Sequence, residues 1–155
     1  MVFNNEKQLK DFLLAKCRNA IAQAEEKVHQ TIDNCLKQFY NEFQPNEYIR
    51  TEQLLHSLVK SEVKKVGNGY EAEVYFDVDG LNYQNGWIET VSGHGYANWD
   101  KDTILDVVMT GSYSGLPHGG HTEGTAIWTE SIKQLGDIWN LLETELRKQG
   151  IPIKK

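Results

Sequence analysis

Residues 5–43 read NEKQLKDFLLAKCRNAIAQAEEKVHQTIDNCLKQFYNEF, and this stretch decides the fold. Apolar or small residues recur every three or four positions, close to the period of an α-helix. No proline or glycine interrupts the run before Pro45, so we predict one helix over about residues 5–43, roughly 55 Å long. Its apolar stripe must be buried against a sheet of its own chain or against a neighbouring copy. The stripe comprises Leu9, Leu13, Cys17, Ala20, Ala24, Val28, Ile32, Cys35 and Phe39.

The length of 155 residues predicts a single domain over residues 1–155. The net charge of −6 disfavours a protein that coats nucleic acid or an anionic membrane. Most of this charge lies in residues 66–155, which hold thirteen acidic and six basic residues. No apolar run is long enough to span a membrane or to direct export, so we expect synthesis in the cytoplasm.

The two cysteines, Cys17 and Cys35, both lie on the apolar stripe of the predicted helix. Eighteen residues of helix separate them by about 27 Å, which is too far for a disulfide. We therefore expect two reduced thiols in the core.

The middle of the chain predicts a β-hairpin over about residues 59–78. Alternating residues before and after Gly67-Asn68-Gly69 indicate two strands joined by a short turn. In the second strand Tyr70, Ala72, Val74, Phe76 and Val78 share the face that we expect to pack on the long helix. Thr51 is a candidate cap for one helical turn before the hairpin.

The rest of the chain contains glycine-rich loops and a closing helix. We predict a loop region over residues 79–128 and a helix over about 130–149, ended by Gly150 and Pro152. Trp128 and Trp139 belong with this helix and are predicted core residues. The fold class is therefore α+β, with a long N-terminal helix on a small antiparallel hairpin sheet, a C-terminal helix and long glycine-rich loops.

Aromatic residues are concentrated in the loops. Loop aromatics anchor protein interfaces, stack on sugars or bases, or plug loops onto the core. We favour contact with other subunits or partners and keep a platform for a sugar or small ligand as an alternative. The predicted interface residues are Tyr83, Trp87, Tyr96, Trp99 and Tyr113.

A metal-dependent enzyme is a second alternative. His118, His121 and Glu123 lie on one loop, and His94 on another is a possible third imidazole. Zinc accepts such side chains, but the spacing matches no known metal signature, and Gly119-Gly120 disfavours a helix here. The chain also lacks the Gly-Lys-Ser/Thr ending of a phosphate loop and the Gly-x-Ser-x-Gly elbow of a hydrolase. Our prediction is therefore no enzyme, no metal and no cofactor.

The whole arrangement resembles the HK97 gene-product-10-like proteins of tailed phages. The likeness rests on the long helix, the Thr-x-x-Leu-x-x-Ser segment within residues 50–58, the turn Gly67-Asn68-Gly69 and the entry to the last helix at residues 124–128. The family commonly has glycine after that threonine, whereas this chain has Glu52.

The resemblance implies a non-enzymatic head–tail connector or tail-completion component. Such a subunit forms a ring with its own copies and contacts portal, adaptor or tail-tube proteins, with no membrane and no specific nucleic acid. The implied location is the neck or tail of the virion, or the host cytoplasm before assembly.

Overall fold

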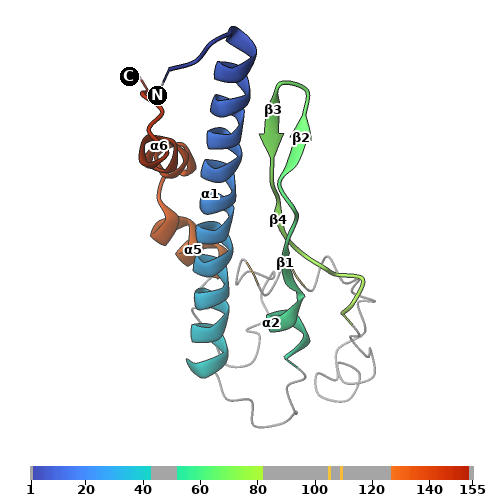
Figure 1. Cartoon of the computed structure of the whole chain (residues 1–155). Helices are drawn as coiled ribbons and strands as arrows, with labels where there is room; N and C mark the ends of the chain where they lie inside the picture. The colour runs from blue at the N-terminus through green and yellow to red at the C-terminus, as the bar shows by residue number, and fades with distance from the viewer. Residues whose placement is uncertain (1, 43–51, 82–104, 106–108, 110–126, 154–155) are drawn as a thin grey trace, which may run out of the picture. The chain divides into compact units, whose positions relative to one another are not determined.

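The computed structural model describes residues 2–42, 52–81, 105, 109 and 127–153. Helices and antiparallel strands follow one another in separate parts of the chain (Figure 1), which confirms the predicted α+β class. The elements are α1 (Glu6–Glu42), α2 (Gln53–Ser57), β1 (Leu58–Lys60), β2 (Lys64–Val66), β3 (Gly69–Glu71), β4 (Val74–Phe76), α5 (Ile127–Leu135) and α6 (Ile138–Lys148).

The chain divides into two compact units. Unit 1 contains Met1–Thr31, Lys60–Tyr75 and Ile132–Lys155, and unit 2 contains Ile32–Val59 and Phe76–Ser131. The single domain over residues 1–155 stays a prediction. Among the described residues, most of the buried apolar side chains belong to unit 2, namely Ile32, Cys35, Leu36, Leu54, Leu58, Leu81, Met109 and Ile127.

Helix α1 has 37 residues and begins within one residue of the predicted start. Its first turn is capped by two reciprocal hydrogen bonds. The backbone N–H of Gln8 donates to Asn5 Oδ1 over 2.9 Å, and the Gln8 side chain accepts from the backbone N–H of Asn4 over 2.9 Å. This arrangement is close to a capping box, and it satisfies donors that a helix leaves unpaired at its start.

The apolar stripe of α1 is not covered along its whole length. Ala20, Ile32 and Cys35 are buried, whereas Leu9 and Leu13 are each 40% exposed. Both cysteines are free thiols, as predicted, although Cys17 is only half-buried. The stripe is therefore covered from its middle onward and open near its start.

The hairpin consists of two short ladders. Strands β2 and β3 pair antiparallel with Lys65 opposite Tyr70, and β1 pairs with β4. The turn lies at Gly67-Asn68, and Gly67 takes the positive φ of 57° that glycine tolerates best. The predicted alternation is confirmed, because every second residue from position 70 to 78 is half-buried and those between are exposed. Packing of this half-buried face on α1 stays a prediction.

The prediction of an unbroken second strand over residues 70–78 is wrong. The ladders are interrupted between residue 60 and residue 64 and between residue 71 and residue 74. At the interruption the backbone N–H of Ser61 donates to the Glu73 carbonyl over 2.8 Å. The hydroxyl oxygen of Ser61 accepts the hydrogen bond from the Glu73 backbone N–H over 3.0 Å. A side chain thus replaces one backbone acceptor of the ladder.

Helix α2 begins differently from the prediction. Its N-cap residue is Glu52 and not Thr51, and Glu52 makes no side-chain capping hydrogen bond. Glu52 has the left-handed backbone angles φ 56° and ψ 12°. Glycine adopts this conformation without steric cost. Glycine is also the residue commonly found at this position in the HK97 gene-product-10-like proteins, which this chain resembles.

The predicted closing helix over residues 130–149 is also wrong, because two helices occupy this region. Gly136 ends α5 with a positive φ of 66°, and its N–H donates to the Ile132 carbonyl over 2.9 Å. Asp137 then caps α6, accepting a hydrogen bond from the backbone N–H of Trp139 over 2.9 Å. The predicted end is correct, since the N–H groups of Gly150 and Ile151 bond back to α6 in a Schellman motif.

Candidate interaction surface

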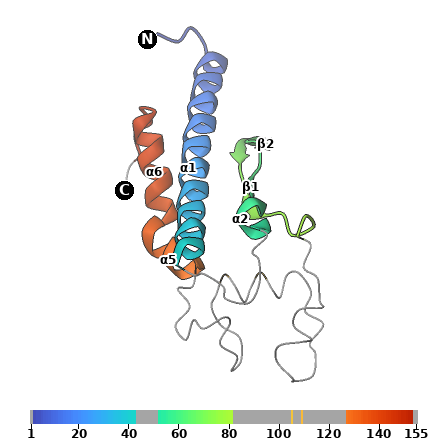
Figure 2. The same ribbon diagram turned by 90° about the horizontal axis from the view of Figure 1, so that it is seen from below.

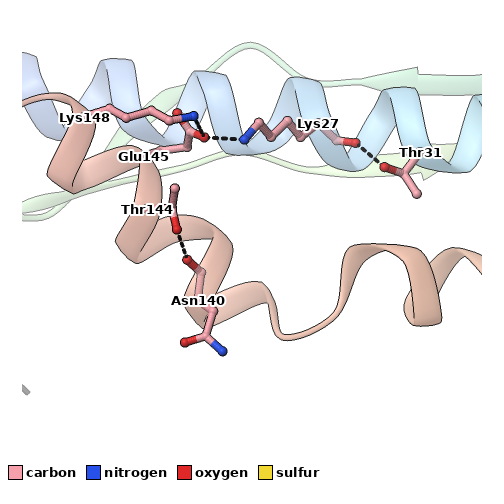
Figure 3. A network of polar contacts seen from close by, with 6 residues as sticks. All are labelled: Lys27, Thr31, Asn140, Thr144, Glu145 and Lys148. Atoms are coloured by element: carbon pink, nitrogen blue, oxygen red, sulfur yellow. Dashed lines mark hydrogen bonds and ion pairs between the residues drawn. The ribbon is translucent and has the colours of Figure 1, made fainter.

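An ion-pair network holds α6 beside α1 within unit 1 (Figures 2 and 3). Glu145 is only 3% exposed, and its Oε1 lies 2.5 Å from Lys27 Nζ on α1 and 3.0 Å from Lys148 Nζ on α6. Glutamate is almost never fully buried unless it is paired. The network is therefore the specific polar contact that docks α6 on this part of α1.

The charges of the network reinforce one another. The hydrogen bond from Lys27, and then that from Lys148, lowers the pKa of Glu145 below its ordinary value of 4.5, against the opposing effect of burial. The same bond to Glu145 raises the pKa of Lys27 above 10.5. Thr31 donates to the Lys27 carbonyl one turn earlier over 2.8 Å, so the Thr31 hydroxyl is also bonded within the molecule.

A second ion pair joins β1 to α1. Lys60 donates to Glu26, which also accepts from the Gln30 side chain over 2.6 Å. The hydrogen bond from Lys60 lowers the pKa of Glu26, and the bond to Glu26 raises the pKa of Lys60. The neighbouring Glu25 is different, because burial raises its pKa and its Oε1 is buried without a hydrogen-bond partner in the described part of the chain. The pair between Lys60 and Glu26 is thus a contact within unit 1.

The residues predicted to carry chemistry or contacts lie outside the described residues. This holds for the metal candidates His94, His118, His121 and Glu123. It also holds for the predicted interface residues Tyr83, Trp87, Tyr96, Trp99 and Tyr113. The metal site, the ligand platform and the aromatic interface therefore stay predictions. Within the residues that the structure describes, no group of three or more His, Cys, Asp or Glu side chains is arranged to hold a metal ion.

The structure instead reveals exposed apolar side chains that the sequence analysis assigned to the core. Trp139 is 76% exposed and Trp128 is 47% exposed, so both core predictions are wrong. Ile132 and Ile138 are exposed as well. For Ile138 and Trp139 the physical reason is the break at Gly136 and Asp137, which ends the helical period before α6 begins. The Gly-Asp pair was the signal for this break, since glycine ends helices and aspartate starts them.

The exposed apolar side chains of unit 1 include two groups on its helices. We call Leu9 and Leu13 the N-terminal helix face, and Ile132, Ile138 and Trp139 the α5–α6 corner. Tryptophan and other aromatic residues are enriched among the residues that dominate binding at protein interfaces. None of the described helices is long and apolar enough to cross a membrane.

Comparison with known proteins identifies a family. No curated protein and no solved structure matches the chain. The model of the YomN family matches residues 5–150, from the residue that precedes α1 to Gly150, just after α6. This match confirms the phage character that the resemblance implied, but it does not extend to the HK97 gene-product-10-like proteins. The chain belongs to the YomN family, a phage-associated family named after a Bacillus prophage gene.

Proposed function

We propose that this protein is a non-enzymatic structural subunit of the neck or tail of a phage or prophage particle. The observation that carries the proposal is the family match, which covers residues 5–150 and connects the chain with phages. The resemblance to head–tail connector and tail-completion proteins supplies the finer part of the proposal. The subunit would act through contacts with its own copies and with portal, adaptor or tail-tube proteins.

The form of α1 supports an assembly role. A helix of 37 residues is about 55 Å long, and its first turns present Leu9 and Leu13 to solvent. An apolar stripe that is buried in its middle and open at one end is typical of an element that is completed by a second protein. The α5–α6 corner adds a tryptophan that is 76% exposed.

The experiment that tests the proposal is the composition of purified particles. After induction of a prophage that encodes the protein, mass spectrometry of gradient-purified virions should detect it at several copies per particle. Deletion of its gene should give filled heads without joined tails, or tails of defective length, in electron micrographs. Expression of the wild-type protein from a plasmid is the control and should restore complete particles.

Two results would contradict the proposal. One is the absence of the protein from purified virions while other minor structural proteins are detected. The other is a deletion strain that releases normal infectious particles.

A further inference from the structure

The turn between β2 and β3, at the tip of the hairpin in Figure 1, contains an asparagine that is directly followed by a glycine. Gly67 and Asn68 are the two central residues of this turn, and Gly69 begins β3 opposite Val66. Gly67 has a positive φ of 57°, as the first central residue of a type II′ hairpin turn does. Asn68 is exposed, so water reaches its side-chain amide.

An asparagine in this setting reacts with its own backbone. The nitrogen of the following residue, after losing its proton, attacks the carbonyl carbon of the asparagine side chain. A five-membered succinimide ring forms, and ammonia leaves. Water then opens the ring at one of its two carbonyl groups and gives either aspartate or isoaspartate. The net reaction exchanges ammonia for water and needs no other reactant. A glycine in the second position favours the attack, because no β-carbon shields its nitrogen.

The structure leaves space around the attacking nitrogen. Among the described residues, a β-carbon added to Gly69 would meet only the Val66 carbonyl oxygen, at 3.8 Å. The obstacle is the β2–β3 ladder, because Gly69 is paired with Val66. This ladder has only three residue pairs, and all three residues of β2 are exposed. Short two-stranded ladders are marginally stable, and exposed segments of this kind open locally at a low cost in free energy.

We propose that Asn68 is a site of self-modification, at which the side chain closes onto the Gly69 nitrogen when the β2–β3 ladder opens. This inference is independent of the proposed function. The helical residues Asn19, Asn34 and Asn140 are exposed as well, but a helix holds the backbone around each of them and none precedes a glycine. Exposure alone therefore does not select Asn68, whereas the turn and the following glycine do.

The products change the hairpin in two ways. Both replace a neutral amide with a carboxylate, so the net charge of −6 becomes one unit more negative. Isoaspartate also directs the backbone through its β-carbon, which adds one atom to a turn of two residues. The length of such a turn fixes the register of the strands that it joins. The isoaspartate form therefore loses the register in which Lys65 lies opposite Tyr70.

Mass spectrometry of the purified full-length protein, incubated at neutral pH, tests the site. Cleavage after glutamate places Asn68 in the peptide of residues 63–71 and separates it from Asn85-Gly86, which lies outside the described residues. The peptide of residues 63–71 should gain about one dalton before the peptides that contain the helical asparagines do. The gain should be faster in mild base, because the attacking nitrogen must lose a proton.

Two glycine variants separate the chemistry from the opening of the ladder. Gly69→Ala places a β-carbon beside the attacking nitrogen and is accommodated at 3.8 Å from the Val66 carbonyl oxygen, so it should slow the mass gain several-fold. Gly67→Ala leaves Asn68-Gly69 intact but forces alanine into a positive φ of 57°. It should weaken the ladder and make the mass gain faster than in the wild type. Thermal melts establish that both variants fold.

Three results would overturn the inference. They are a peptide 63–71 that reacts no sooner than the helical asparagines, equal rates in the wild type and Gly69→Ala, and a Gly67→Ala rate no higher than that of the wild type. Nuclear magnetic resonance tests the consequence for the hairpin. Cross-strand contacts between Lys65 and Tyr70 should persist in Asn68→Asp, which adds the charge without the extra backbone atom, and should be lost in the isoaspartate form. Contacts that persist in both forms would contradict the loss of register.

Discussion

Replacing Glu145 with glutamine tests the contact that holds α6 on α1. The change keeps the shape of the side chain but removes the charge that Lys27 and Lys148 share at 2.5 Å and 3.0 Å. Removal of one partner from a buried ion pair costs about 3–5 kcal/mol. The two lysine side chains are 43% and 56% exposed and regain water when the carboxylate is lost. We therefore expect a loss of about 2 kcal/mol in the free energy of unfolding, about half of the value for a fully buried pair.

The assay is urea unfolding followed by circular dichroism, with thermal melts in parallel. A loss of about 2 kcal/mol lowers the melting temperature by roughly 4–8 °C for a chain of this size. The matched control is Asp33→Asn, which breaks the pair between Asp33 and Lys37, one turn apart on the surface of α1. Pairs of that kind contribute about 0.3–0.5 kcal/mol, so the control should remain close to the wild type.

The pH dependence of the same comparison identifies the charge as the cause. The pKa of Glu145 is lowered in the folded protein, so the ion pair stabilises the fold fully above the ordinary pKa of 4.5. This stabilisation is lost as the pH falls through the lowered pKa. The stability difference between wild type and Glu145→Gln should therefore be constant near neutral pH and shrink below pH 4.5. A variant as stable as the wild type at neutral pH, or a difference that persists in strong acid, would refute the reasoning.

Three further substitutions test local features of the fold. Asp137→Ala removes the cap of α6 and should lower the free energy of unfolding by about 1 kcal/mol in urea titrations, whereas Asp137→Asn, which keeps an acceptor oxygen, should cost little. Glu52→Gly should raise the free energy of unfolding by up to about 1 kcal/mol, because glycine relieves the strain of the left-handed backbone conformation. A measured loss of stability would contradict that conformation. Glu25→Gln should raise the free energy of unfolding by on the order of 1 kcal/mol at pH 7, because it removes the charge from a partly buried carboxylate that has one buried oxygen without a hydrogen-bond partner in the described part of the chain. Since the pKa of Glu25 is raised in the folded state, protonation stabilises the wild type as the pH falls, and this gain should shrink in acid.

The sequence predicted the elements whose signals are local and repeated. Helix α1 has an apolar residue every three or four positions over ten turns and no breaker, so no competing structure fits the pattern. The hairpin was equally clear, because alternation on both sides of Gly67-Asn68-Gly69 predicts which residues share a face. The interruption at Ser61 was not predictable in the same way, since it depends on a side-chain hydrogen bond to the backbone of Glu73 across the hairpin.

The errors in the last third of the chain arise from competition between two signals. Apolar residues from Ile132 to Leu146 keep a helical period, and that period predicts one helix. Gly136 and Asp137 indicate the end of one helix and the start of another. In the structure these local signals outweigh the helical period of the apolar residues. The buried Glu145 was also missed. Its sequence neighbours Arg147 and Lys148 are ordinary for an exposed face, and its main partner, Lys27, lies 118 positions away.

A periodic stripe predicts that apolar side chains will be buried, but not which chain will cover them. The part of α1 that belongs to unit 1, residues 6–31, is about 39 Å long, whereas α6 has 11 residues and is only about 16 Å long. Helix α6 meets α1 at Lys27, and at 1.5 Å per residue Leu13 lies about 21 Å from that point along the helix axis. A helix of this length, docked at Lys27, cannot cover Leu9 and Leu13 as well, and both are exposed in the structure. The sequence pattern is the same at Leu13 as at Ile32, but Leu13 is exposed and Ile32 is buried, so the period alone does not separate an exposed surface from a core.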